Sequence, residues 1–134
     1  MKGKAYKKIH KIKISSLINK KLSTIKYGVH GLKVVTPGIL TAKQIETARR
    51  VISRATKRIG TVFIRVFFNL PITKKPLLSR MGKGCGVIKS WVAIIKKGTV
   101  VIEVDGISQD FAKQVLKAAG IRLPLQVCII SRCV

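Results

Sequence analysis

The stretch TAKQIETARRVISRATKRIG, from Thr41 to Gly60, carries the clearest folding signal in the chain. Thr41 and Gln44 have the spacing of a capping box, in which each side chain bonds the other residue's free backbone N–H at the start of a helix. Apolar residues then recur at helical spacing and form one stripe: Ile45, Ala48, Ile52, Ala55 and Ile59. Gly60 is suited to a C-terminal cap. The stretch therefore predicts an amphipathic helix that begins after Thr41 and ends at Gly60.

The face of this helix opposite the apolar stripe is cationic. At about 100° per residue, five basic side chains gather there: Lys43, Arg50, Arg54, Lys57 and Arg58. Only Glu46 offsets their charge. The pattern predicts a ridge of positive charge on this helix that faces a negatively charged partner.

Around this helix the sequence alternates between extended segments and turns. The expected strands are residues 29–35, ended by Pro37-Gly38, residues 62–68, residues 91–95, residues 99–104 and residues 125–130. The turn Lys96-Lys97-Gly98 predicts a hairpin between the third and fourth of these strands. In residues 62–68, Val62, Ile64, Val66 and Phe68 are expected to share one face.

A second helix is expected to begin after Ser108 and to end at Gly120, with Asp110 in its first turn, where the helix dipole favours a negative charge. Its core face is expected to hold Phe111, Ala112, Val115, Leu116 and Ala119. Two helices among strands that meet in hairpins predict an α+β fold with a mixed or antiparallel sheet.

Residues 69–86 are expected to form a long loop, with two prolines and three glycines. A doubled-back loop of this length could project roughly 25–30 Å from the core. Loops longer than about 12–15 residues are uncommon unless they are functional or disordered. The segment RMGKGCG (80–86) has glycine at alternate positions, which permits close backbone approach. It fits neither the P-loop nor the dinucleotide-binding motif. The alternatives left open are an RNA-inserting loop and a flexible basic surface loop.

The composition is strongly cationic. Lys and Arg number 28 against four Asp and Glu, a formal net charge of +24, which indicates a polyanionic partner such as RNA or DNA. A hydrophobic content of 47% supports a folded core. We expect a basic RNA-binding arm over residues 1–26 without fixed structure on its own, and a single domain over residues 27–134. The arm's basic, acid-poor composition also permits an organelle transit peptide. The apolar runs are too short to cross a membrane.

Enzymatic chemistry is not expected. Four carboxylates are few, and Glu103 and Asp105 are interpreted as a solvated strand end or as partners of nearby lysines. The three cysteines lack CxxC spacing and lie far in sequence from His10 and His30, so we predict neither a metal nor another cofactor. Aromatic residues make up 5%, too few for a base-stacking platform, and Trp91 is expected in the core.

Several motifs together resemble one family, the bacterial-type large-subunit ribosomal protein number sixteen. They are LTAKQIETARR (40–50), FIRVF (63–67), PITKKP (71–76), RMGKGCG (80–86), WVAII (91–95) and EVDG (103–106). The resemblance covers residues 27–130 in order and spacing. It implies a hammerhead-like β motif, large-subunit rRNA, the five-S rRNA region, tRNA and neighbouring ribosomal proteins as partners, and no small-molecule substrate. It implies a structural constituent of the large ribosomal subunit that helps position tRNA near the A and P sites.

The resemblance also assigns residues. The implied rRNA-binding set is Lys7, Lys8, His10, Lys11, Lys43, Arg49, Arg50, Arg54, Lys57, Arg58, Lys74 and Lys75. The implied loop tip near tRNA and the peptidyl-transferase centre is Arg80, Met81, Gly82, Lys83, Gly84 and Gly86. Cys85 stands where the family usually has a second lysine, and IKISSLINKKLS (12–23) replaces a run rich in Gly and Arg.

The bias of the chain toward Ile and Lys favours a mitochondrial ribosome, with a bacterial cytoplasm or a plastid as the alternatives. Two other classes stay open. A free-standing nucleic-acid-binding regulator would need a helix with base-reading Asn or Gln, which neither helix clearly offers. An RNA-modifying enzyme would need more carboxylates or a cofactor loop.

Overall fold

The computed structural model describes residues 8, 14, 18–19, 21–82 and 84–132. Its elements, in chain order, are β1 (His30–Val34), β2 (Gly38–Thr41), α1 (Ala42–Ala55), β3 (Thr61–Ile64), β4 (Leu70–Lys74), β5 (Val87–Ile95), β6 (Val100–Asp105), α2 (Gln109–Gly120) and β7 (Val127–Ser131). The fold is therefore of the mixed α+β class, as the sequence predicts.

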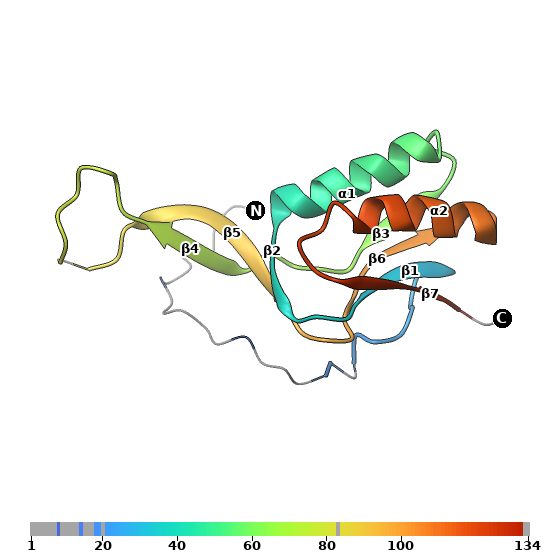
Figure 1. The fold of residues 1–134 in the computed structure, drawn as a ribbon, viewed down its shortest axis with the longest axis horizontal. Coiled ribbons are helices and arrows are strands. Elements are labelled where there is room, and N and C mark those ends of the chain that lie inside the picture. The colour runs from blue at the N-terminus through green and yellow to red at the C-terminus, as the bar shows by residue number, and fades with distance from the viewer. Residues whose placement is uncertain (1–7, 9–13, 15–17, 20, 83, 133–134) are drawn as a thin grey trace.

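The strands form two antiparallel sheets. The first has the order β3-β6-β1-β7 and the second has the order β2-β5-β4. Both helices lie side by side over one face of the four-stranded sheet (Figure 1). The core fills the space between the helices and this sheet. It is made of fully or almost fully buried side chains, among them Leu32, Ile102, Val104, Ile45, Ala48, Ile52, Val115, Leu116 and Ala119.

The start of α1 confirms the prediction, and its end corrects it. Thr41 is the N-cap, and both hydrogen bonds of the capping box with Gln44 are present. The helix ends at Ala55, well before Gly60, and Ile59 is 77% exposed. The buried Thr56 hydroxyl donates to the Ile52 carbonyl (3.0 Å), and the chain then turns away toward β3. Ala55 and Ile59 therefore do not extend the apolar stripe.

The predicted hairpin of residues 91–104 is wrong in its pairing, although its turn exists. Thr99 N–H donates to the Lys96 carbonyl (3.2 Å), and Gly98 has φ 84°, a conformation that favours glycine. However, β5 pairs with β2 and β4, whereas β6 pairs with β1 and β3. The Val34 carbonyl of β1 accepts from Gly98 N–H (2.7 Å), and Val34 N–H donates to the Thr99 carbonyl (2.9 Å). Because β1 pairs with the chain from this turn onward, β6 belongs to the four-stranded sheet and not to the sheet of β5. The turn thus joins two sheets.

Other strands and helices also differ from the sequence prediction. The sequence interpretation missed β2, because Pro37-Gly38 interrupts the extended chain for only a few residues before pairing resumes with β5. The strand expected over 62–68 ends at Ile64, which is 41% exposed, and the Arg65 N–H makes one further bond to the Val101 carbonyl of β6 (3.0 Å). Ser108 occupies the N-cap of α2 without a side-chain capping bond. Phe111, expected in the core, is 40% exposed.

The segment 69–86, expected to be one long loop, contains strand β4, which pairs with an extended β5. Only residues 75–86 form the connection. The strand carries a proline at position 71 and ends in the polar residues Thr73 and Lys74, so it shows no clear strand periodicity in the sequence. Trp91, opposite Pro71, is half-buried. The β4–β5 hairpin and its loop project away from the helices and the four-stranded sheet (Figure 1), so the expected projection is confirmed as a hairpin rather than a bare loop.

The segment leading into β1 runs along the side of the four-stranded sheet away from the helices (Figure 1). Asn19 N–H donates to the Lys97 carbonyl (2.9 Å), and Leu22 accepts from Val100 N–H (2.9 Å). Asn19 and Leu22, two of the arm residues that the structure describes, therefore contact the turn before β6 and the first residue of β6.

Glu103 of β6 anchors the end of this segment. Its carboxylate is fully buried, pairs with Arg65 (2.6 Å) and accepts the backbone N–H groups of Lys26, Tyr27 and Gly28 (2.7–3.2 Å). The interpretation of Glu103 as a solvated strand end is therefore wrong. Burial alone raises the pKa of Glu103, and these hydrogen bonds outweigh burial, so the pKa lies below its ordinary value.

Candidate nucleic-acid interface

The C-terminal half of α1 and the turn after it gather basic side chains around a shallow hollow. Its lining residues, called here the α1 cationic cluster, are Arg49, Arg50, Ser53, Arg54, Lys57 and Arg58. The arginines of the helix are brought together by helical spacing, and the turn adds the last two residues. Cations at a helix C-terminus are favoured by the partial negative charge of the helix dipole.

One carboxylate lies beside this cluster. Glu46 accepts from Arg49 (2.7 Å) and from Arg50 (3.2 Å) on the same helix. The bond from Arg49, with a smaller contribution from Arg50, lowers the pKa of Glu46 to about 2. Within the described ranges, no ion pair involves Arg54, Lys57 or Arg58. These three cations are therefore available to a phosphate group.

The turn after α1 holds two basic residues in an unusual backbone conformation. Arg58 N–H donates to the Ser53 carbonyl (3.1 Å) and Lys57 N–H donates to the Arg54 carbonyl (3.2 Å), the two bonds of a Schellman motif. Lys57 has φ 48° and Arg58 has φ 67°, in the left-handed region where glycine is the usual residue. Strain of this kind clusters at functional sites, so cations at these positions favour a binding role.

Replacing Lys57 by glycine is expected to stabilise the fold while weakening polyanion binding. Glycine adopts φ 48° without steric cost, so the free energy of unfolding should rise by about 0.5–1 kcal/mol. The lost charge should reduce the slope of log affinity against log salt by roughly 0.7–0.9. Chemical denaturation and RNA titrations at several salt concentrations measure the two effects. Lys57→Ala is the control, which loses the charge without the gain in stability. A lower free energy of unfolding for Lys57→Gly than for the wild type would contradict the inference that the backbone at Lys57 is strained.

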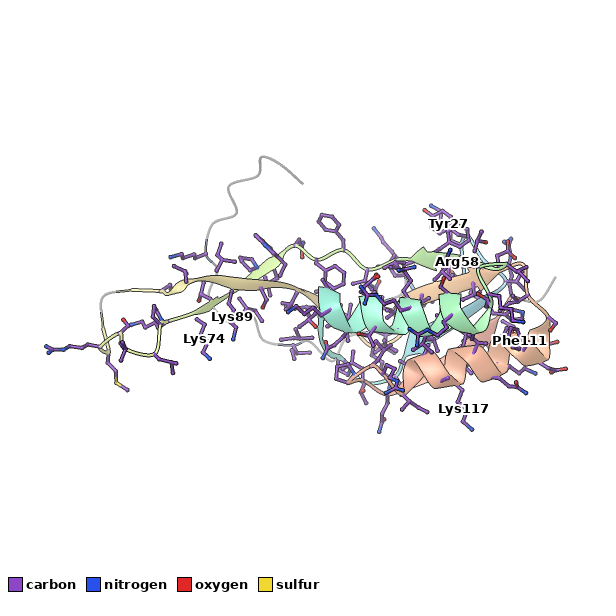
Figure 2. All side chains as sticks on the ribbon, turned by 90° about the horizontal axis from the view of Figure 1, so that it is seen from above. Tyr27, Arg58, Lys74, Lys89, Phe111 and Lys117 are labelled. Atoms are coloured by element: carbon purple, nitrogen blue, oxygen red, sulfur yellow. The ribbon has the colours of Figure 1, made fainter. Side chains whose placement is uncertain are left out.

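The cationic surface extends beyond the residues that the sequence singled out. Arg122, just after α2, lines a second hollow together with Arg50 and Arg54. Lys89 and Lys74 lie on the same side of the β4–β5 hairpin (Figure 2). The sequence interpretation missed Arg122 because it follows the second helix, and Lys89 because β5 was started at Trp91. Lys43 is exposed in the first turn of α1.

The hairpin loop combines exposed side chains with two kinds of glycine. Gly82 (φ 97°) and Gly84 (φ 81°) adopt left-handed conformations in open space. Gly86 instead lies at the base of the loop, where a Cβ would come within 2.4 Å of the Lys74 carbonyl oxygen. The Lys75 ammonium donates to the Gly82 carbonyl and ties the loop back on itself.

Other loop side chains face outward. Leu77, Leu78 and Met81 are 96%, 100% and 102% exposed, and Arg80 is also exposed. Lys8 of the arm donates to the Cys85 carbonyl (3.4 Å) and lines a hollow with residues of this loop. The structure therefore brings Lys8 to the loop, whereas the α1 cationic cluster lies apart, on the body of the molecule (Figure 1). Lys7, His10, Lys11 and Lys83, which the sequence also nominated, lie outside the described residues.

No three His, Cys, Asp or Glu side chains of the described residues lie close enough together to hold a metal ion. Among the helices of the described chain, none is both long and apolar enough to cross a membrane. Cys85 and Cys128 are exposed free thiols.

An α+β domain with an exposed cationic helix end and a projecting basic hairpin has the charge distribution expected of a polyanion-binding protein. The chain belongs to the ribosomal protein L16p/L10e family, whose family model matches residues 1–130. It is 45% identical over 127 residues to the large ribosomal subunit protein uL16 of Psychrobacter cryohalolentis, covering 95% of this chain and 92% of that protein. The uL16 of Psychrobacter arcticus matches with the same identity and coverage. The family is one of ribosomal proteins, which are structural components and not enzymes.

Proposed function

We propose that the protein is a structural constituent of the large ribosomal subunit that binds rRNA and helps to position tRNA near the A and P sites. The observation that carries the proposal is the family match over residues 1–130, nearly the whole chain. The cationic surfaces support it independently, because a net charge of +24 on a folded domain calls for a polyanion.

The α1 cationic cluster is the main rRNA contact in this proposal. Guanidinium groups bind phosphate oxygens through two parallel hydrogen bonds, and Arg54 and Arg58 lie at the exposed hollow. Such contacts fix the position of a protein on RNA without reading its sequence. Lys74, Lys75 and the arm lysines add further phosphate contacts, and the five-S rRNA region and neighbouring ribosomal proteins are the proposed surroundings.

The hairpin loop is the proposed approach to tRNA. Its projection (Figure 1), its exposed Arg80 and the open backbone at Gly82 and Gly84 suit insertion between RNA backbones. The side chains of Leu77 and Leu78 are almost fully or fully exposed, so both are accessible to a partner. The loop is therefore proposed to act on tRNA while α1 holds the protein in the subunit.

Cosedimentation tests the ribosomal assignment. The protein should remain with the large subunit through a high-salt wash that removes loosely bound factors. Recovery only in free or DNA-bound fractions would contradict the proposal and would favour a free-standing DNA-compacting protein.

Shortening the loop should separate the two proposed roles. Deleting residues 77–85 leaves Pro76 joined to Gly86, and the close approach of Gly86 to Lys74 allows the hairpin to close. We expect rRNA affinity within about threefold of the wild type, because the α1 cluster supplies the phosphate contacts. Accommodation of tRNA on assembled particles, or late subunit assembly, should be impaired. Failure of incorporation, without a translation defect in particles that do assemble, would contradict this division of roles.

We also propose a mitochondrial ribosome as the location, on the Ile and Lys bias of the chain. The bacterial origin of both relatives keeps a bacterial cytoplasm as the alternative, together with a plastid. Fractionation of the source cells, followed by immunodetection in the organelle and cytoplasmic ribosome pools, decides between them.

A further inference from the structure

Tyr27 presents an aromatic ring at the surface, backed by a second ring. Its side chain stacks on Phe63 of β3, with ring centroids 5.8 Å apart and planes inclined by 29°. Tyr27 is nevertheless 56% exposed, while Phe63 is half-buried. The sequence indicated no stacking platform, because these residues lie far apart in the chain. The structure brings them together through the segment that packs beside β6.

The backbone beneath this ring is held firmly. Glu103 accepts the N–H groups of Tyr27 (2.7 Å) and of Gly28 (3.0 Å), and the buried Arg65 neutralises the carboxylate. Gly28 packs so closely on β6 that a Cβ would lie 2.7 Å from the Val104 carbonyl oxygen. The ring is therefore exposed on a rigid support, and little conformational entropy is lost when a ligand stacks on it.

A cation completes the arrangement. The Lys26 ammonium lies over the Tyr27 ring, 5.4 Å from its centroid, within the range of a cation–π contact, so a base that stacks on this face displaces the ammonium toward the edge of the ring. Lys26 is exposed, so its flexible chain can also reach a phosphate beside the ring. The nearby carboxylate of Glu103 is buried and paired, and it does not repel an anion at the surface. An aromatic face beside a cation fits a nucleotide, whose base stacks and whose phosphate carries a negative charge.

We propose that Tyr27 is a stacking site for an unpaired RNA base, with Phe63 as its backing and Lys26 as the contact to the neighbouring phosphate. This inference rests on the proposed rRNA-binding function. The Tyr27 site shares no residue with the α1 cationic cluster, and the two differ in their proposed contacts, with phosphates at α1 and with a base at Tyr27. Glu103 is a positioning residue for this site and does not touch the RNA.

Substitution at Tyr27 tests the inference through affinity and its salt dependence. The full chain is titrated with large-subunit rRNA transcribed in vitro, at several salt concentrations. Tyr27→Leu keeps apolar cover over the sheet and removes the aromatic face, so affinity should fall roughly five- to a hundredfold. The salt slope should stay unchanged, because no charge is lost. Tyr27→Phe keeps the face and should bind within about twofold of the wild type.

Two controls separate the possible outcomes. Thermal unfolding of each variant shows whether a change in affinity follows a change in folding. Arg54→Gln should weaken binding and reduce the salt slope, which identifies the phosphate contacts. If Tyr27→Leu binds like the wild type while Arg54→Gln does not, the stacking site is wrong and the proposed function stands. If the wild-type chain does not bind the rRNA at all, the proposed function itself fails.

Crosslinking identifies the occupant. A photoreactive phenylalanine derivative at position 27, in protein assembled into large subunits, should crosslink to an rRNA nucleotide. Crosslinks only to a neighbouring ribosomal protein would overturn the assignment to RNA.

Discussion

Replacing Arg65 by methionine is expected to lower the free energy of unfolding by about 3–5 kcal/mol, enough to unfold a marginally stable domain. The Arg65 side chain is 7% exposed and its partner Glu103 is fully buried. Methionine fills similar space but leaves the carboxylate buried without its countercharge. Arg65 also donates to the Thr24 carbonyl, so the substitution should release the segment before β1 as well. Denaturant unfolding followed by circular dichroism measures the loss.

The surface pair on α1 provides the control. Arg49→Met removes one of the two partners of Glu46, a carboxylate that is 40% exposed, and water can replace the lost bonds, so stability should change little. If Arg65→Met cost no more than Arg49→Met, Glu103 would not be the buried anchor described above.

The pH dependence of the stability loss in Arg65→Met tests the same prediction in a second way. Because the pKa of Glu103 is lowered on folding, its stabilising contribution is complete above the ordinary carboxyl value of 4.5. The contribution declines as pH falls below 4.5 and is lost as pH passes through the lower folded pKa. The penalty of Arg65→Met should therefore shrink in acid. A penalty independent of pH would indicate lost packing rather than an unpaired charge.

Reversing two charges of the α1 cationic cluster is the second change with a large expected effect. The double variant Arg50→Glu with Arg54→Glu should weaken binding to large-subunit rRNA by roughly tenfold to a hundredfold at physiological salt. The slope of log affinity against log salt should fall by about 1.4–1.8, since two phosphate contacts are lost. Filter binding or fluorescence anisotropy over a range of salt concentrations measures both quantities.

A matched control lies on the other helix. Lys113 and Lys117 are exposed on α2, and Lys117 points away from the body of the molecule (Figure 2). Reversing both changes the net charge by the same amount, but leaves the α1 cluster intact. Equal losses from the two double variants would mean that the whole field of the protein, and not the α1 cluster, determines affinity.

The sequence predicted the elements whose signals are local. The capping box at Thr41 and the buried Ile45, Ala48 and Ile52 depend only on neighbours along one helix, and all are confirmed. The end of that helix was misplaced because Thr56 bonds back to Ile52, and the next two residues adopt a left-handed turn that steric rules reserve mainly for glycine. Arg50 and Arg54 of the α1 cationic cluster follow from the same helical period, whereas Lys57 and Arg58 are placed by the turn after the helix.

Features that depend on distant pairing were not predictable. The turn at Gly98 was recognised, but nothing local shows that β1 draws β6 away from β5. Strand β4 carries a proline and polar residues, so its pairing with β5 is visible only in three dimensions. The burial of Glu103 likewise depends on Arg65 and on a segment far from both in sequence. The Tyr27–Phe63 pair was missed for the same reason.

A density map of the large ribosomal subunit that contains this chain would test the central proposal most directly. The guanidinium groups of Arg54 and Arg58 should lie against rRNA phosphates, and the loop of residues 75–86 should extend toward the tRNA sites. A map in which the α1 cationic cluster faces solvent, or in which the chain is absent from the subunit, would contradict the proposed function.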